Sequence, residues 1–194
     1  MPAGATRIMR LKRGEIPQGT IALARYLLGK VLVREWSNAK AAGRIVETEA
    51  YLTNDPACHA FRGMTPRNRS LFLPAGHAYV YLCYGTSYLL NVSSEAEGVG
   101  EGVLLRALEP LCGTVHKQHL MRGPGRLTAA LDVDRRFDGI DLFAPGPLWI
   151  GTDGQPVGRI GRSARIGITK AAEARLRYFI RGSRYLSGPK SLNE

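Results

Sequence analysis

Three residues that can take part in proton transfer alternate along one short stretch, Gly43–Tyr51. Glu47, Glu49 and Tyr51 occupy every second position behind a pair of β-branched residues. Because side chains alternate between the two faces of a β-strand, this spacing places both carboxylates and the phenol on one face. Two interpretations stay open on this stretch alone: an edge strand with a solvated acidic face, or a carboxylate held where it activates a water molecule.

The charge balance indicates a polyanionic partner. The 194 residues include 27 Lys and Arg against 16 Asp and Glu, a formal net charge of +11. Such an excess favours nucleic acid as the partner. The sequence has no 18-residue apolar run and no strongly amphipathic basic helix, so we expect no membrane association.

The cysteines and histidines do not form a recognisable metal motif. Cys58, Cys83 and Cys112 are far apart, and the sequence contains neither a Cys-x-x-Cys pair nor a His-Glu-x-x-His motif. We therefore expect no zinc site, no other metal, and no nucleotide or flavin cofactor. The N-terminus lacks the apolar core of a signal peptide, and the odd cysteine number suits a reducing compartment.

The apolar pattern predicts a mixed α+β fold in a single compact domain over residues 1–194. We expect a curved antiparallel β-sheet with surrounding helices and one protruding β-hairpin, and loose tails at 1–16 and 187–194. Thr20 is a suitable N-cap for a helix over 21–28. The other expected elements are a hairpin of strands 30–34 and 44–52, the protruding hairpin over 76–93, strands at 103–110 and 147–150, helices at 114–121 and 126–131, a basic loop and strand over 161–168, and a short strand or helix over 176–181.

The protruding hairpin concentrates tyrosines. Four of the eight tyrosines fall within 76–93, and the turn Tyr84–Ser87 places Tyr84 at the tip. An aromatic side chain exposed at a hairpin tip is what a wedge into stacked bases requires. The alternative is that tyrosines are simply common in strands.

Arginines accompany these elements. Arg106 interrupts an apolar strand and needs an anionic partner, for which Glu49 is a candidate; a purely structural ion pair is the alternative. Arg67 and Arg69 lie in a loop almost free of acids and suit phosphate contacts, although a solvated loop is equally compatible. Arg126 belongs to a glycine turn that leads into a helix whose amides suit a phosphate.

Five blocks together resemble one known family, the alkyladenine (3-methyladenine, methylpurine) DNA glycosylases of the eukaryotic-type fold. Thr-Pro-Arg-Asn-Arg, Val-Glu-Thr-Glu-Ala-Tyr, the tyrosine-rich hairpin and Leu-Leu-Arg-Ala-Leu-Glu-Pro are specific in combination. The resemblance covers nearly the whole chain, in the blocks 43–52, 65–72, 79–94, 103–110 and 177–183.

The resemblance implies a role for each matched residue. Glu49 would deprotonate a water for attack at C1′, and Arg106 would help fix that water, with a backbone carbonyl near Ile168 as a third ligand. Tyr84 would intercalate where the nucleotide leaves the duplex. The remaining matches are pocket residues: Tyr51, His59 and Tyr81 as aromatic walls around the flipped base, and Asn91 as the residue that crowds the amino group of guanine.

The expected activity is therefore excision of 3-methyladenine, 7-methylguanine, hypoxanthine or ethenoadenine from double-stranded DNA, which leaves an abasic site. No lysine falls within the matched pocket blocks, so we expect hydrolysis without a Schiff base. The expected enzyme is a monomer, cytoplasmic and nucleoid-associated in a bacterium or nuclear in a eukaryote.

Two rival interpretations make different predictions. A helix-hairpin-helix glycosylase would use the segment 123–129 as its hairpin and Asp138 or Asp141 as its catalytic acid, on an almost wholly helical fold. A non-catalytic basic DNA-binding module would explain the charge and Tyr84, but would bind damaged and normal duplex equally.

Overall fold

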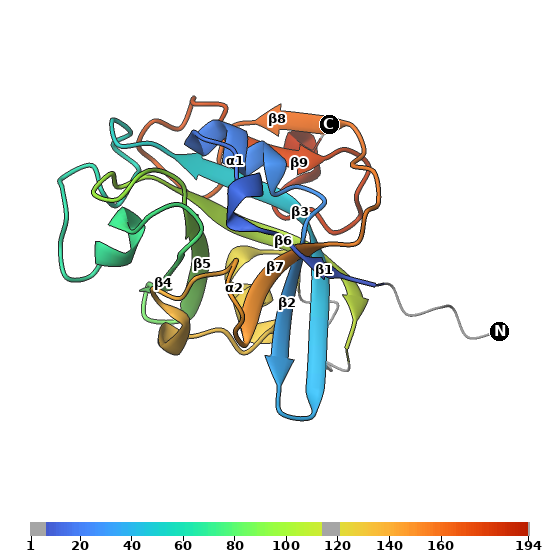
Figure 1. The fold of residues 1–194 in the computed structure, drawn as a ribbon. Helices are drawn as coiled ribbons and strands as arrows, with labels where there is room; N and C mark the ends of the chain where they lie inside the picture. The colour runs from blue at the N-terminus through green and yellow to red at the C-terminus, as the bar shows by residue number, and fades with distance from the viewer. Residues whose placement is uncertain (1–6, 114–120, 194) are drawn as a thin grey trace.

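A computed structural model describes residues 7–113 and 121–193. Its centre is a nine-stranded antiparallel sheet in which β1, β7, β2, β3, β6, β5 and β4 follow one another, while β9 pairs with both β3 and β8 (Figure 1). The expected mixed α+β architecture is confirmed. The strands are β1 Met9–Arg10, β2 Val31–Trp36, β3 Ala39–Tyr51, β4 Ala78–Cys83, β5 Ser87–Ser93, β6 Gly102–Cys112, β7 Leu148–Thr152, β8 Ile160–Ser163 and β9 Arg177–Ile180; the helices are α1 Thr20–Tyr26 and α2 Pro124–Ala130, with short 3-10 turns at Arg13–Glu15, Arg69–Phe72, Arg135–Phe137 and Lys190–Leu192.

β3 is the central strand of this sheet. Its first half pairs with β2 and its second half with β9, while β6 runs along its other edge. Irregular register between β3 and β6 falls on both sides of Glu47. The edge-strand interpretation of Glu47 and Glu49 is therefore wrong: both carboxylates are fully buried within the sheet.

Helix α1 covers one face of β3. Leu23, Ala24 and Leu27 are fully buried against the main core. Thr48, between the two glutamates, points the other way and donates a hydrogen bond to the Ala24 carbonyl at 2.8 Å. Because side chains alternate along the strand, the helix takes the face of Thr48 and leaves the opposite face to the glutamates.

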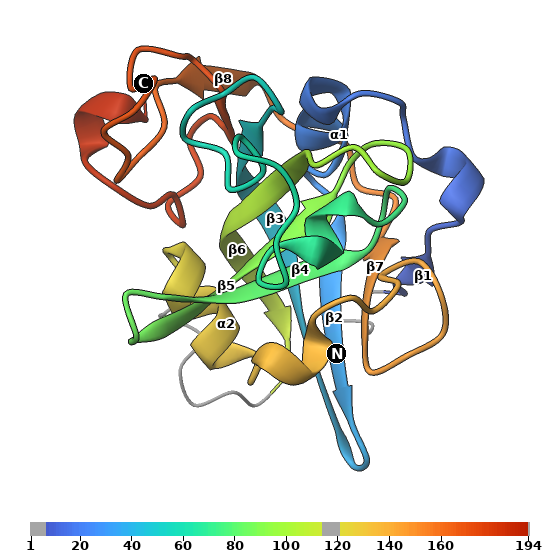
Figure 2. The ribbon, with the colours of Figure 1, turned by 90° about the vertical axis from the view of Figure 1, so that its left-hand side faces the viewer.

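Two hairpins extend from the body of the sheet. In Figure 2 the β2–β3 hairpin extends downward, and the β4–β5 hairpin reaches out to one side next to α2. α2 supports the second hairpin, because Thr128 Oγ1 donates to the Tyr88 carbonyl at 2.6 Å. The predicted hairpin over 76–93 is confirmed, and its tip is held away from the core.

The chain termini differ from the prediction. Within 1–16, residues 1–6 lie outside the described part, but Met9–Arg10 pairs with β7 and Leu11 is buried in the core. Ser187 is also buried and bonds to Glu47. The expectation of loose tails at 7–16 and 187–193 is therefore wrong, since both segments supply partners to buried groups.

Two local expectations also need correction, and a third falls almost wholly outside the described residues. Thr20 is the first residue of α1 rather than its cap, and its hydroxyl bonds to Ser94 at 2.7 Å. Strand β8 precedes the irregular segment 164–168 instead of following it. The helix expected at 114–121 lies outside the described residues except for Met121, whose carbonyl accepts from the Leu108 amide at 2.9 Å. No helix in the described ranges is long and apolar enough to cross a membrane.

Candidate active site and nucleic-acid interface

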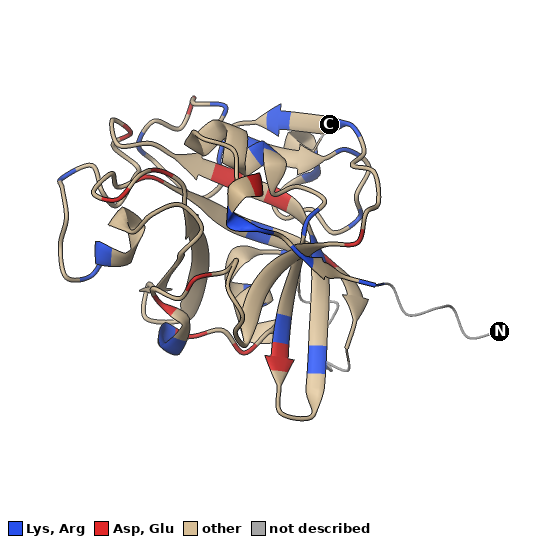
Figure 3. Cartoon of the chain, viewed as in Figure 1, with Lys and Arg blue, Asp and Glu red and all other residues tan. Residues whose placement is uncertain are grey.

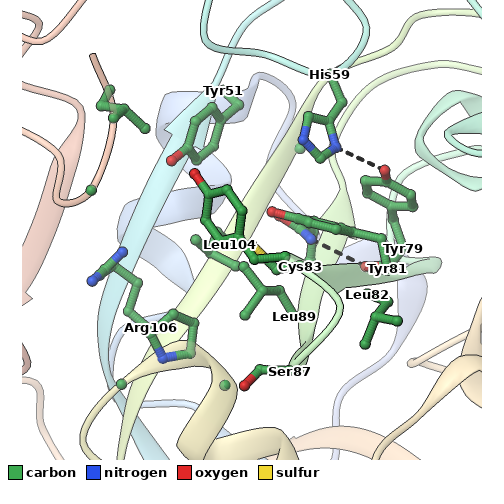
Figure 4. Close-up of a pocket in the computed structure, with 18 of the residues that line it drawn as sticks. Tyr51, His59, Tyr79, Tyr81, Leu82, Cys83, Ser87, Leu89, Leu104 and Arg106 are labelled. Carbon is green, nitrogen blue, oxygen red and sulfur yellow. Dashed lines mark hydrogen bonds between the residues drawn. The ribbon is translucent and has the colours of Figure 1, made fainter. Parts of the chain in front are cut away.

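A cavity of about 1210 Å³ opens between the β4–β5 hairpin, α2 and the loops at 57–67 and 166–168. Its lining is mixed: aromatic rings gather on one side, and Arg106 and Ser87 lie among apolar side chains such as Leu89 and Leu104 on the other (Figure 4). A purine is largely flat and apolar with polar edges, so such a lining suits it. The predicted site residues that line the cavity are Tyr51, His59, Arg67, Tyr81, Tyr84, Asn91, Arg106 and Arg126.

Three rings form a continuous aromatic wall. The His59 and Tyr81 centroids are 4.5 Å apart, and Tyr81 stacks on Tyr79 at 5.2 Å. His59 Nδ1 shares a 2.9 Å hydrogen bond with the Tyr79 hydroxyl (Figure 4). Burial lowers the pKa of His59, so its imidazole is neutral at pH 7. Tyr79 is not among the predicted site residues, although its spacing of two from Tyr81 is a signal that could have found it.

Asn91 lies on β5 directly across from Tyr79. Its side chain is 7% exposed, and Nδ2 donates to the Tyr79 carbonyl at 3.2 Å. The amide is thus fixed in one orientation by the strand that carries two of the rings. Asn91 and the aromatic wall are held together by the β4–β5 pair.

Glu49 lies behind the cavity wall. Its Oε2 accepts from the Tyr51 hydroxyl at 2.9 Å and lies 3.2 Å from Arg106 Nη1, while Oε1 accepts from the Ile166 amide at 2.8 Å. Glu49 itself does not line the cavity, whereas these three partners do. A carboxylate has about four acceptor positions, so about one remains for a further donor.

The environment of Glu49 suits a base. Burial raises the pKa of Glu49 above its ordinary value, and Arg106, the Ile166 amide and the Tyr51 hydroxyl only partly oppose that effect. A carboxylate with a raised pKa accepts a proton more readily than an exposed one. Arg106 is 6% exposed and has the carboxylate partners that an arginine in an apolar strand requires.

Glu47 has a different set of partners. It accepts hydrogen bonds from Arg106 Nε at 2.9 Å and Arg177 Nε at 2.7 Å. The amide and hydroxyl of Ser187 donate to it at 2.6 and 2.8 Å. Burial alone would raise the pKa of Glu47, but the two guanidiniums and the Ser187 amide together lower it. No pattern in the sequence indicates Arg177 or Ser187 for this role.

The hairpin tip exposes Tyr84. Its side chain is 91% exposed, and Tyr84 and Gly85 both have positive φ, 48° and 70°. Left-handed residues at these two positions are typical of the tight turns that match strand twist in hairpins. The turn closes with the Thr86 amide donating to the Cys83 carbonyl at 3.0 Å, so the exposed ring stands on a defined turn.

The predicted phosphate-binding arginines separate into two groups. Arg67 and Arg126 line the cavity, and Arg67 Nη2 donates to the Leu82 carbonyl of the hairpin at 3.0 Å. Arg69 is exposed in the 3-10 turn Arg69–Phe72 and is not part of the cavity lining. Figure 3 shows that lysines and arginines are spread over several elements, while acidic residues interrupt β3.

The residues of the helix-hairpin-helix interpretation serve other purposes. Asp138 accepts from the Val80 amide at 2.9 Å, and Asp141 pairs with Arg13 at 2.6 Å. Neither lines the cavity, and the fold is a large sheet rather than a helical array. Among the described residues, no group of three or more His, Cys, Asp or Glu side chains is arranged to hold a metal ion.

The fold and site define a class. A cavity lined by aromatic rings, a buried carboxylate beside it and an exposed tyrosine on a hairpin tip are the parts that an enzyme needs to act on a base taken out of a duplex. The family model described as methylpurine-DNA glycosylase matches residues 15–184. The chain belongs to this family and is a DNA glycosylase.

Individual relatives agree with the family match. A protein of Mesorhizobium japonicum, named "Putative 3-methyladenine DNA glycosylase", is 58% identical over 193 residues, which cover 95% of this chain and 93% of the relative. A protein of the same name from Methanoculleus marisnigri is 44% identical over 192 residues, 92% of this chain and 99% of the relative. The rival non-catalytic interpretation does not account for this membership.

Proposed function

We propose that this enzyme flips alkylated or deaminated purines out of duplex DNA and hydrolyses their N-glycosidic bond with a water activated by Glu49. The substrate class comprises 3-methyladenine, 7-methylguanine, hypoxanthine and ethenoadenine. The observation that carries the proposal is the contact of Glu49 with Tyr51 and Arg106, both of which line the aromatic cavity.

The proposed reaction forms one bond to C1′ and breaks another. The water oxygen attacks C1′ and its proton passes to Glu49, while the C1′–N bond breaks and its electron pair leaves with the purine. The carboxylate also stabilises the positive charge that develops on the sugar. A cationic alkylpurine leaves as a neutral base, whereas a neutral lesion such as hypoxanthine must also take up a proton, from an acid or from water, as it leaves. The products are the free base and an abasic site.

The cavity wall supports selection of damaged purines. Stacking on an aromatic ring contributes roughly 1–3 kcal/mol per base, and an electron-poor alkylated purine gains more than a normal one. Tyr51, His59 and Tyr81 are proposed to supply the rings, and the amide of Asn91 is proposed to crowd the exocyclic amino group of guanine.

The hairpin and the arginines support duplex binding. Tyr84 is proposed to fill the gap left by the flipped nucleotide, and Arg67, Arg69 and Arg126 to contact the DNA backbone. One lesion in a duplex offers one asymmetric site, so we propose a monomer. No lysine lines the cavity within the described residues, which supports hydrolysis without a Schiff base.

The decisive experiment is single-turnover excision from duplex oligonucleotides that carry one hypoxanthine or one ethenoadenine, read by alkaline strand cleavage. Wild type is compared with Glu49→Gln, each with and without EDTA. We expect excision that survives EDTA and falls about 10²–10⁴-fold in Glu49→Gln. Full activity in Glu49→Gln would overturn the assignment of the base, and a complex trapped by borohydride would overturn simple hydrolysis.

A second experiment separates flipping from chemistry. Tyr84→Ala should slow excision from a duplex and leave excision from a single-stranded oligonucleotide unchanged, since only the duplex has a stacked gap to fill. Affinity for the duplex should fall steeply with salt, because each phosphate contact releases counterions. Equal slowing on the duplex and the single strand would mean that Tyr84 acts on the chemical step rather than by filling the gap in the duplex.

A further inference from the structure

The Arg106 guanidinium has a separate partner for each of its nitrogens. Nε donates to Glu47 Oε1 at 2.9 Å, Nη2 donates to the Ser187 hydroxyl at 3.2 Å, and Nη1 lies 3.2 Å from Glu49 Oε2. The guanidinium is planar and rigid. Two contacts along the Nε–Nη2 edge therefore fix the direction in which Nη1 points.

We propose that Ser187 is a positioning residue for the glycosylase reaction: together with Glu47, its hydroxyl holds Arg106 so that Nη1 faces Glu49 and the attacking water. This inference rests on the function proposed above for Glu49 and Arg106. Ser187 lies beyond residues 15–184, the range that the family model matches, so the assignment comes from the contacts of this chain alone.

The hydrogen-bond directions at Ser187 are consistent with this role. Its hydroxyl donates to Glu47 Oε1 at 2.8 Å, so the oxygen lone pairs are free to accept from Arg106 Nη2. Its amide donates to Glu47 Oε2 at 2.6 Å. Ser187 is 6% exposed, and these contacts leave its hydroxyl little freedom to turn away.

The C-terminal segment 187–193 keeps Ser187 in place. Arg177 Nη1 donates to the Leu192 carbonyl at 2.8 Å, and Arg177 Nη2 donates to Asn193 Oδ1 at 2.6 Å. Arg177 is fully buried and also bonds to Glu47. The end of the chain is thus attached to the same carboxylate that orients Arg106.

The experiment compares Ser187→Ala with Ser163→Ala as a matched control. Ser163 Oγ accepts from Arg177 Nη1 at 2.8 Å, so its loss removes one buried hydroxyl from the same network without touching Arg106. Both variants are assayed by single-turnover excision of hypoxanthine from a duplex across a range of pH, with thermal unfolding in parallel. A merely structural role would lower the melting temperature of both and leave their rates alike.

We expect Ser187→Ala to slow excision about tenfold or more, the effect of losing a hydrogen bond to a charged group. The charged and titratable groups around Glu49 are Glu47 and Tyr51 on its own strand, Arg106 on β6, Arg177 opposite it on β9, and Arg165, which lies over the Tyr51 ring at 4.5 Å. Of these, Arg106 lowers the pKa of Glu49 most. A loosened Arg106 should therefore move the acid limb of the rate profile to higher pH, and Ser163→Ala should not.

Ser187→Cys provides a second variant if the alanine variant does not fold, because it keeps nearly the same shape with a weaker hydrogen-bonding group. Like Ser187→Ala, it should slow excision and move the acid limb of the rate profile to higher pH. A rate and acid limb equal to those of Ser163→Ala would overturn the inference.

Glu49→Gln in the same assay distinguishes the two levels of the proposal. Lost excision in Glu49→Gln with an unchanged Ser187→Ala would overturn only the role of Ser187. Retained excision in Glu49→Gln would overturn the proposed function and the inference with it.

Discussion

Glu47 and Glu49 are two residues apart on β3 and both are fully buried, yet their surroundings differ. Glu47 accepts from two arginines and from both donors of Ser187. Glu49 has one arginine, one hydroxyl and one amide. The pKa of Glu47 is lowered and that of Glu49 is raised. Two neighbouring carboxylates whose pKa values are pushed apart are suited to different roles.

The difference arises from what lies beyond each carboxylate. Glu47 faces β9 and the C-terminal segment, where Arg177 and Ser187 donate hydrogen bonds to both of its oxygens. Glu49 contacts Tyr51, Arg106 and the Ile166 amide, all of which belong to residues that line the cavity. A base must be able to gain a proton during the reaction, and a carboxylate saturated by two guanidiniums resists this.

The largest expected contrast is in stability. Glu47→Gln should lower the free energy of unfolding by about 3–5 kcal/mol, because it leaves buried Arg177 without its carboxylate partner and Arg106 with Glu49 alone. Glu49→Gln should leave the free energy of unfolding almost unchanged or increase it. Burial already disfavours the charged form of Glu49, and Arg106 still pairs with Glu47 in this variant. Urea unfolding at pH 7 measures both. Equal losses would remove the distinction between the two carboxylates.

The pH dependence of stability should follow opposite signs. The lowered pKa of Glu47 contributes stability that is present above its unfolded pKa and lost as pH falls through the folded value. The raised pKa of Glu49 contributes stability below its unfolded pKa that is lost as pH rises through the folded value. A difference of one pH unit between the folded and unfolded pKa of a carboxyl corresponds to about 1.4 kcal/mol.

Unfolding curves of both variants from pH 4 to 8 check these signs. The deficit of Glu47→Gln should shrink toward acid, and the advantage of Glu49→Gln should grow toward neutral pH. Parallel curves for the two variants would contradict the assigned directions.

The acid limb of excision should report Glu49 rather than Glu47. The single-turnover rate on hypoxanthine should fall about tenfold per pH unit below a pKa above the ordinary range of a glutamate. The measurement is a rate profile at constant ionic strength, restricted to pH values at which the enzyme stays folded. A limb at the ordinary value would mean that Glu49 is more hydrated in the DNA complex than in the free enzyme.

The smallest expected effect belongs to Tyr51→Phe. It keeps the aromatic ring and removes the hydroxyl that donates to Glu49 at 2.9 Å. Because that hydrogen bond lowers the pKa of Glu49, the acid limb of the rate profile should move to higher pH. The plateau rate should change only slightly. The same experiment on Tyr81→Phe is the control, since that ring also lines the cavity.

Local pattern is enough to predict the strand that carries the glutamates, the protruding hairpin and the exposed tip at Tyr84. These features depend on alternation and turn residues that act over a few positions. The family resemblance adds Tyr51, His59, Tyr81, Asn91 and Arg106, and the structure brings all five to one cavity.

The sequence by itself determined the chemistry available to this protein: two carboxylates on one strand, a tyrosine-rich hairpin and a large positive charge. The family resemblance points to Glu49 as the base, but only the tertiary structure decided which of the two carboxylates is saturated with donors. That decision depends on Ser187, which is 140 positions from Glu47, and on Arg177, which is 130 positions away. Residues so far apart in the sequence come into contact only when β6, β9 and the C-terminal segment pack against β3. No local periodicity in the sequence encodes such contacts.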